Sequence, residues 1–309
     1  MTKNLVSKIF VKKEDNLMAV GYSIDHDTNK NSSHDEQQKH KQHIQDYQDQ
    51  HQDHQQQQQH HHQPPSSKQY NVNLQYDPIT PEAQKATKLI ISISDQRIGD
   101  AIRDFELLHD KLLHLIIVGE DLSYFAHIHP TLGDNGENFT IFHTFPESGR
   151  YKLWIEFKPK DGNQTLVAFM IKVSGYPIHK YIPLVYDRKY IKESLDRKYR
   201  ISLKLPEKLV SHTDADIVFS VSDVAGNPVT ELEPLMGAGG HSVIISSDIK
   251  EFLHVHPTEE VDPISWKGGP AISFKTNFPK PDLYKTWGQF QHHGKLLTAD
   301  FTLKVEEHL

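Results

Sequence analysis

The chain contains no cysteine among its 309 residues. This absence excludes disulfides, thiolate nucleophiles, iron-sulfur clusters, and cysteine-ligated zinc and blue-copper sites. Any tightly held metal ion must therefore use histidine, carboxylate or methionine side chains. The lack of thiols does not identify a redox compartment, because a protein without cysteine suits the inside and the outside of the cell equally.

A dominant charge of one sign and a long apolar run are also missing. The 34 basic and 41 acidic residues give a net charge of -7, without a basic block suited to phosphate, so nucleic acid is not an expected partner. No run approaches the roughly 18 apolar residues of a membrane span, and the N-terminal apolar runs are too short for a signal peptide. We expect a soluble, cytoplasmic protein. Residues 1–13 lack acidic side chains, which keeps a mitochondrial location as the alternative.

Low-complexity sequence follows a short N-terminal segment, residues 1–23. Residues 24–68 are rich in Gln and His and cannot build a core, which predicts a disordered linker. The histidines of this tract could alternatively gather metal ions loosely.

The rest of the chain has an all-β pattern. Short stretches rich in Val, Ile, Tyr, Phe and Thr alternate with Gly, Pro, Asn and Asp. Seven such stretches in residues 69–174 suit a β-sandwich, and their order recurs in residues 199–309. Residues 175–198 contain Gly and Pro and predict a connector. The sequence therefore predicts two tandem β-sandwich repeats that arose by internal duplication.

Each repeat carries the same histidine spacing. The first set is His114, His127 and His129, and the second, 127 residues later, is His241, His254 and His256. Strand residues i and i+2 share a face, so the two histidines of each His-x-His pair can chelate one ion. With hairpin turns centred at Glu120-Asp121 and Ser247-Asp248, we expect His114 directly opposite His127, and His241 directly opposite His254. Three imidazoles would then converge on an ion about 2 Å from each nitrogen.

The repeated spacing is informative because the two copies differ at most of the surrounding positions. A duplication copies any spacing automatically, so the repetition alone indicates common origin. Between residues 109–130 and 236–257, seven of 22 positions are identical, and three of these seven are the histidines. Clustered histidines with converging geometry mark metal sites, and imidazole ligands suit Cu or Zn.

A fourth donor could come from five positions upstream of the first histidine. This position is His109 in one repeat and Met236 in the other. A thioether favours Cu(I), so the site that contains Met236 would favour copper. Alternatively, both residues are loop residues without a ligand role, and the histidines are packed, hydrogen-bonded core residues beside apolar Ile116 and Phe125.

Two segments resemble a known group of proteins. Residues 112–130, which end in His127-Ile-His129-Pro130, and residues 284–291 are similar to bacterial exported proteins built from YtkA-like or FixH-like β-sandwich domains, often as paired repeats. The resemblance implies an immunoglobulin-like sandwich and a link to heavy metals, especially copper, at the six histidines named above. The chain departs from that group by its missing export signal and its Gln/His tract.

Three functions are compatible with these features. The first is a non-catalytic module that binds Cu or Zn for buffering, storage or delivery, with a protein partner for metal transfer. The second is a three-His metalloenzyme, similar to a zinc hydrolase or a bicupin, because three ligands leave a coordination position open. The third is a structural or protein-interaction sandwich without metal. We expect no catalytic residues beyond the metal ligands, because the sequence has no nucleophile elbow, phosphate loop or His-Glu-x-x-His motif.

Overall fold

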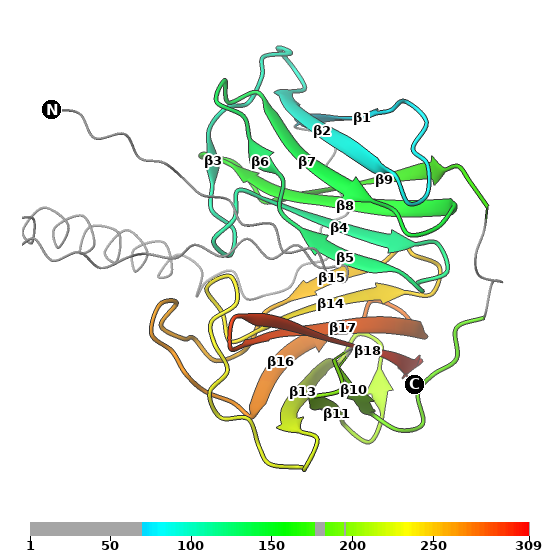
Figure 1. Ribbon diagram of the computed structural model, residues 1–309, viewed down its shortest axis with the longest axis vertical. Coiled ribbons are helices and arrows are strands. Elements are labelled where there is room, and N and C mark those ends of the chain that lie inside the picture. Colours follow the sequence, from blue (N-terminus) through cyan, green and yellow to red (C-terminus); the bar gives the residue numbers. More distant parts are fainter. Residues whose placement is uncertain (1–69, 177–182, 195, 309) are drawn as a thin grey trace, which may run out of the picture. The chain divides into compact units, whose positions relative to one another are not determined.

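A computed structural model describes residues 70–176, 183–194 and 196–308 of the chain (Figure 1). The N-terminal segment and the Gln/His-rich linker predicted from the sequence lie outside these residues. The described part consists of strands and connecting loops without helix, so it contains no helix that could cross a membrane.

The first repeat is a sandwich of two sheets. One sheet has the order β1-β2-β7-β6, and in the other β8 lies between β4 and β9, with β5 beyond β4 and the short β3 paired to one end of β8. The strands are β1 (Tyr70–Asp77), β2 (Ala86–Asp95), β3 (Phe105–Glu106), β4 (Leu113–Gly119), β5 (Phe125–Ile128), β6 (Thr131–Leu132), β7 (Asn138–Thr144), β8 (Gly149–Pro159) and β9 (Thr165–Val173).

The second repeat follows the same plan. Its sheets have the orders β10-β11-β13-β16 and β12-β18-β17-β14-β15. The strands are β10 (Ile191–Glu193), β11 (Tyr199–Lys204), β12 (Leu209–Val210), β13 (Asp214–Asp223), β14 (His241–Ser246), β15 (Phe252–Val255), β16 (Ala271–Asn277), β17 (Asp282–His292) and β18 (Lys295–Glu306). The expected fold of two tandem immunoglobulin-like sandwiches is confirmed.

Alternating sequences build the two sandwich cores. Side chains of β2 and β13 alternate between buried and partly exposed, as expected for strands with one face on a core. Each repeat also has the tyrosine corner of immunoglobulin-like sandwiches, in which a tyrosine near the start of a core strand bonds the preceding backbone. The Tyr151 hydroxyl donates to the Glu147 carbonyl, and the Tyr284 hydroxyl donates to the Lys280 carbonyl, each at 2.9 Å.

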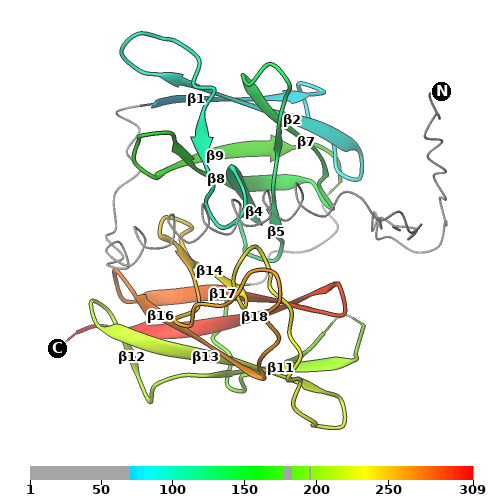
Figure 2. The same cartoon turned by 90° about the vertical axis from the view of Figure 1, so that its left-hand side faces the viewer.

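Strands β4 and β14 are buried on both faces. One face of each strand joins the core of its own sandwich, and the other joins a third apolar cluster shared by both repeats. The fully packed members of this cluster are Ile116, Val118, Leu122, Trp154, Val243, Ile245 and Trp287. The sheet with β4 and β5 therefore lies against the sheet with β14 and β15 (Figures 1 and 2).

Aromatic stacking connects the two sheets reciprocally. Trp154 stacks on Phe252 with ring centroids 4.9 Å apart, and Trp287 stacks on Phe125 at 4.6 Å. Each tryptophan thus contacts the phenylalanine of the other repeat. The Lys152 ammonium adds a hydrogen bond of 2.5 Å to the Ile249 carbonyl.

The hairpin registers differ from those expected from the sequence. His127 lies opposite Ile116 rather than His114, and His254 lies opposite Val243 rather than His241. The turns are centred one residue later than expected, because Leu122 and Ile249 take left-handed conformations with φ of 59° and 51°. This moves each pairing partner by two residues. Since side chains alternate with a period of two, the histidines stay on one face.

We expect the inter-repeat stacking to contribute a measurable coupling energy. In a double-mutant cycle, Trp154→Leu and Phe252→Leu should couple by about 0.5–1.5 kcal/mol in the free energy of unfolding measured by urea titration. The matched control is the cycle of Trp154→Leu with Phe125→Leu, because Phe125 stacks on the other tryptophan. Equal coupling in both cycles would contradict the described packing.

Candidate metal centre

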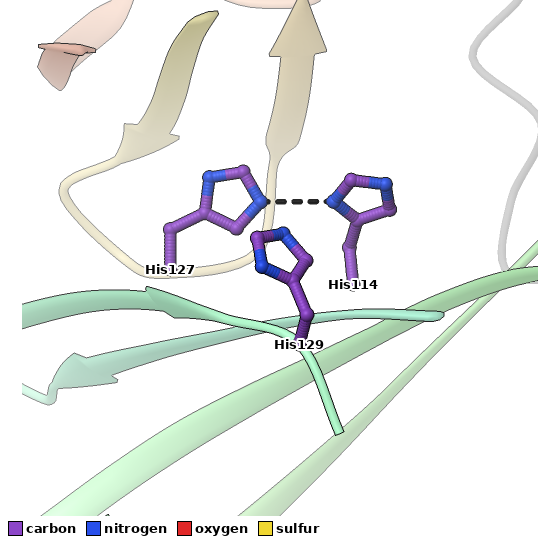
Figure 3. A group of neighbouring side chains, drawn as sticks. All are labelled: His114, His127 and His129. Carbon is purple, nitrogen blue, oxygen red and sulfur yellow. Dashed lines mark hydrogen bonds between the residues drawn. The ribbon is translucent and has the colours of Figure 1, made fainter. Parts of the chain in front are cut away.

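Each histidine set forms a triad at one end of the buried face that the repeats share. His114 lies on β4, His127 on β5, and His129 immediately after β5; the second repeat places its three histidines equivalently on and after β14 and β15. Within each triad, one nitrogen of every ring lies within 4.8 Å of the others. The three rings of the first triad point toward one another (Figure 3).

The triads face away from the cores of their own sandwiches. His114 shares its strand face with Ile116 and Val118, which pack between the repeats, whereas Leu115 and Ile117 point into the first core. Both His114 and its counterpart His241 are fully buried. The histidines are therefore interface residues and not part of either sandwich core.

Backbone carbonyls fix the tautomer of the first histidine in each triad. The Nε2 atom of His114 lies 2.7 Å from the Leu108 carbonyl oxygen, and Nε2 of His241 lies 2.9 Å from that of Leu235. A carbonyl oxygen can only accept, so each Nε2 carries the proton and donates. The Nδ1 atom of each ring consequently presents a lone pair.

Side chains from the opposite repeat orient the second histidine. Nδ1 of His127 donates to Oε1 of Gln289 at 2.9 Å, and Nδ1 of His254 donates to a carboxylate oxygen of Glu156 at 2.7 Å. Each Nε2 atom therefore carries the lone pair. Metal-binding histidines usually donate their other N–H to a carbonyl or carboxylate in this way, which fixes the ring and raises its basicity as a ligand.

The nitrogen atoms turned inward lack ordinary partners. Nδ1 of His114 and Nε2 of His127 lie 2.9 Å apart, although both carry lone pairs once their outer N–H groups donate (Figure 3). Within the described part of the chain, four buried histidine nitrogens have no hydrogen-bond partner: Nε2 of His129, His254 and His256, and Nδ1 of His241. Each such atom costs about 1–3 kcal/mol when left unpaired. A cation among them would satisfy these lone pairs.

Burial keeps the six imidazoles neutral. Loss of water lowers the pKa of every histidine in both triads, and neighbouring histidines lower it further for most of them. The pKa of His129 falls to about 2. The pKa of His254 lies well below its ordinary value, although this ring donates to the Glu156 carboxylate. Neutral imidazole is the form that binds a metal ion.

The two candidate fourth donors lie beside the triad of the opposite repeat. His109 and Met236 occupy equivalent tight turns, each with a φ of 49°. The His109 ring stacks on His256 with centroids 3.4 Å apart. Met236 lines a cavity of about 410 Å³ together with His127 and His129. The sequence paired each donor with its own repeat, whereas the structure brings it next to the other one.

Sequence reasoning missed Glu156 and Gln289. In register, Glu156 lies beside His114 on the neighbouring strand, and Gln289 lies beside His241. The available signal was a carboxylate within the aromatic segment Trp154–Phe157, because a charged side chain between buried strand residues requires a partner.

A family model described as "Domain of unknown function (DUF8832)" matches residues 65–175 and 193–307, which together cover more than two thirds of the chain. The two matches coincide with the two sandwiches, so the duplication seen in the sequence and the structure is also present in the family assignment. A comparison with curated proteins gives no match. The resemblance to YtkA-like and FixH-like domains stays a prediction.

Solved structures of low similarity include an Escherichia coli adhesin, FdeC, at 16% identity and a TM-score of 0.25, covering 79% of this chain and 66% of the adhesin chain. Another is E. coli alpha-2-macroglobulin, at 10% identity and a TM-score of 0.27, with 76% and 16% of the two chains covered. A carbohydrate-binding module of the β-sandwich superfamily matches at 12% identity and a TM-score of 0.22, covering 78% of this chain and all of the module. Scores this low carry no argument about function.

Because the histidines of both triads are buried in their neutral form, we expect acid to destabilise the folded, metal-free protein. Their pKa values are lowered in the folded state below the ordinary value of 6.5, so the unfolded chain binds more protons below that pH. The free energy of unfolding should be independent of these histidines above about pH 7. Below pH 6.5 it should fall by up to about 1.4 kcal/mol per pH unit for each histidine. Urea unfolding of chelator-treated protein at several pH values measures this slope.

The variant His254→Gln with His256→Gln should flatten that slope, whereas the exposed His212→Gln should leave it unchanged. A pH-independent stability between about pH 7 and pH 5 would contradict the burial of neutral histidines.

Proposed function

The chain belongs to the DUF8832 family, and we propose that it is a non-catalytic metal-binding protein that buffers, stores or delivers Cu or Zn through its two histidine triads. The observation that carries the proposal is the set of inward lone pairs. Four outer acceptors, the carbonyls of Leu108 and Leu235 and the side chains of Gln289 and Glu156, direct one lone pair from each of four rings toward the triads.

The donor set favours these two metals. Cu and Zn accept imidazole nitrogens, whereas Ca²⁺ and Mg²⁺ prefer oxygen ligands. With metal-nitrogen bonds of about 2.0–2.1 Å, the ligand nitrogens of a tetrahedral site lie about 3.3 Å apart, so the 2.9 Å between the nitrogens of His114 and His127 has to widen by a few tenths of an ångström when an ion binds. Purely structural packing, the alternative without metal, would leave the inward nitrogens of both triads unpaired.

The cavity beside the first triad offers an entry path for an ion. His127 and His129 are among its lining residues, together with Met236 and Gln289. A metal site that exchanges its ion requires such access. A carrier function also implies a protein partner that receives the ion, and we propose that this partner docks where the cavity opens.

A three-His metalloenzyme is the second candidate, and the same cavity favours it. Its volume of about 410 Å³ lies within the range of small-molecule sites, about 300–1,000 Å³. Three histidine ligands leave one position for a water molecule that zinc would activate. Asp110, which also lines the cavity, is the carboxylate that could then act as a base. The carrier remains the proposal, because Met236 lies in the same cavity as a donor for that open position.

We expect Zn²⁺ or Cu to raise the melting temperature of the metal-free protein. An ion at a hundred times its Kd adds about 2.7 kcal/mol of stability. His127→Ala and His254→Ala should each reduce the bound metal measured by elemental analysis and shrink the thermal shift. His143→Ala, which removes a partly buried histidine outside both triads, is the matched control.

If the protein emerges metal-free from Zn- and Cu-replete expression, and neither ion changes its melting temperature, the metal-binding proposal is wrong. Hydrolysis of ester or amide probes by the zinc-loaded protein, abolished by Asp110→Asn, would instead favour the enzyme.

Glu156→Gln should weaken metal binding at the second triad by about 10–100-fold, as measured by competition with a chelator. Gln retains an oxygen that accepts from His254 but loses the negative charge, so the change separates charge from geometry. The reciprocal control, Gln289→Glu, places a carboxylate beside His127 and should strengthen binding at the first triad. Unchanged affinity in both variants would exclude a role of these side chains in tuning the ligands.

A further inference from the structure

The two triads are close enough to act on one another. The ring centroid of His254 lies 5.2 Å from that of His114 and 5.2 Å from that of His127, and the rings of His127 and His241 are 6.0 Å apart. Rings within one triad have similar separations, such as 4.9 Å between His127 and His129. The six imidazoles therefore form one continuous cluster rather than two remote sites.

Each triad is oriented by a side chain that belongs to the opposite repeat. Glu156 of the first repeat orients His254 of the second, and Gln289 of the second repeat orients His127 of the first. The turn residues follow the same rule. The His109 ring stacks on His256 at 3.4 Å and lies 5.8 Å from both His241 and His254, whereas His114 of its own repeat is 6.0 Å away. Met236 lines the cavity of the first triad.

This exchange makes the two positions chemically different. The first triad gains a thioether donor, which is soft, and a neutral amide that orients His127 from outside the donor set. The second triad gains a fourth imidazole donor, and a carboxylate with one negative charge orients His254 from outside the donor set. Thioether and imidazole ligands suit Cu(I), whereas imidazoles supported by a carboxylate suit Zn²⁺.

We propose that the triads form one coupled two-ion centre in which each position takes its fourth donor from the opposite repeat. Met236 completes the first triad, which selects Cu(I). His109 completes the second triad, which selects a divalent ion such as Zn²⁺, by turning its ring out of the stack on His256, because two stacked rings cannot both direct an in-plane lone pair at one ion. The proposal rests on the proposed metal-binding function and deepens it by assigning a different ion to each position.

Charge supports a mixed pair. Coulomb repulsion between two ions scales with the product of their charges, so a monovalent and a divalent ion repel half as strongly as two divalent ions at the same separation. Among the groups in the described part of the chain that hydrogen-bond the two triads, Glu156 supplies the one carboxylate that offsets these charges. The centre therefore accommodates Cu(I) beside Zn²⁺ better than it accommodates two Zn²⁺ ions.

Two background variants of the full chain isolate each position. His254→Ala with His256→Ala leaves the first triad, and His127→Ala with His129→Ala leaves the second. Circular dichroism and thermal melting establish folding, and Gln replaces Ala in any background that fails to fold. Cu(I) affinity is measured anaerobically by competition with a chromogenic chelator, and Zn²⁺ affinity by competition with a fluorescent one.

In the first-triad background, Met236→Leu should lower the Cu(I) affinity by about tenfold or more, because even the loss of a group that only orients a ligand costs about 10–100-fold. Met170→Leu, which changes a methionine 40% exposed to solvent, is the matched control and should have no effect. In the second-triad background, His109→Gln should lower the Zn²⁺ affinity similarly. His212→Gln is its control, since this exposed histidine has the same left-handed backbone, with φ of 58° against 49°.

The assignment of each fourth donor to the opposite repeat is overturned if Met236→Leu lowers metal affinity only in the second-triad background and His109→Gln only in the first-triad background. The assignment of fourth donors is overturned if neither change alters affinity while the wild-type chain still binds both ions. Both results leave the proposed function intact. Failure of the wild-type chain to bind either ion would overturn the proposed function itself, and this inference with it.

Discussion

The burial of the β4–β5 sheet against the β14–β15 sheet is the interaction on which the candidate site depends. Ile116, Val118 and Trp154 on one side and Val243, Ile245 and Trp287 on the other exclude water from the shared face. The histidines lie at one end of this face. If the sheets were separated, His127 and His254 would lose the partners that orient them, and the imidazoles would return to water. Sheet packing and site assembly are therefore one event.

Duplication followed by divergence explains why the site is nearly symmetric but not equivalent in its two halves. The two triads, the carbonyls that anchor them and the stacked tryptophans are shared by both copies. The copies differ where charge and softness are set, with Glu156 against Gln289 and His109 against Met236. Under the proposed metal-binding function, such differences change which ion is preferred without disturbing the packing, because they affect the ligand environment and not the apolar contact.

Much of the fold could be predicted from the sequence, because local patterns carry it. Alternating apolar residues, turn residues and the order of stretches that recurs in residues 199–309 are enough to predict two sandwiches in tandem, and the period of two places both histidines of each His-x-His pair on one face. The exact hairpin register was not predictable, since it depends on left-handed backbone at Leu122 and Ile249, which are residue types that rarely adopt it. The error of two residues preserved the face and hence the triads.

The sequence by itself determined which residue types are available to hold an ion and how each triad is spaced. Only the tertiary structure decided what surrounds them. Both triads lie on a shared buried face, and Glu156 and Gln289 reach across to the opposite repeat. His109 stacks on a histidine of the second triad, and Met236 lines the cavity beside the first. The physical reason is the distance along the chain over which each feature is specified. Strand periodicity is visible within a few residues and the duplication in a comparison of the two halves of the sequence, whereas the packing of one repeat on the other arises from apolar surfaces whose pairing no local pattern specifies.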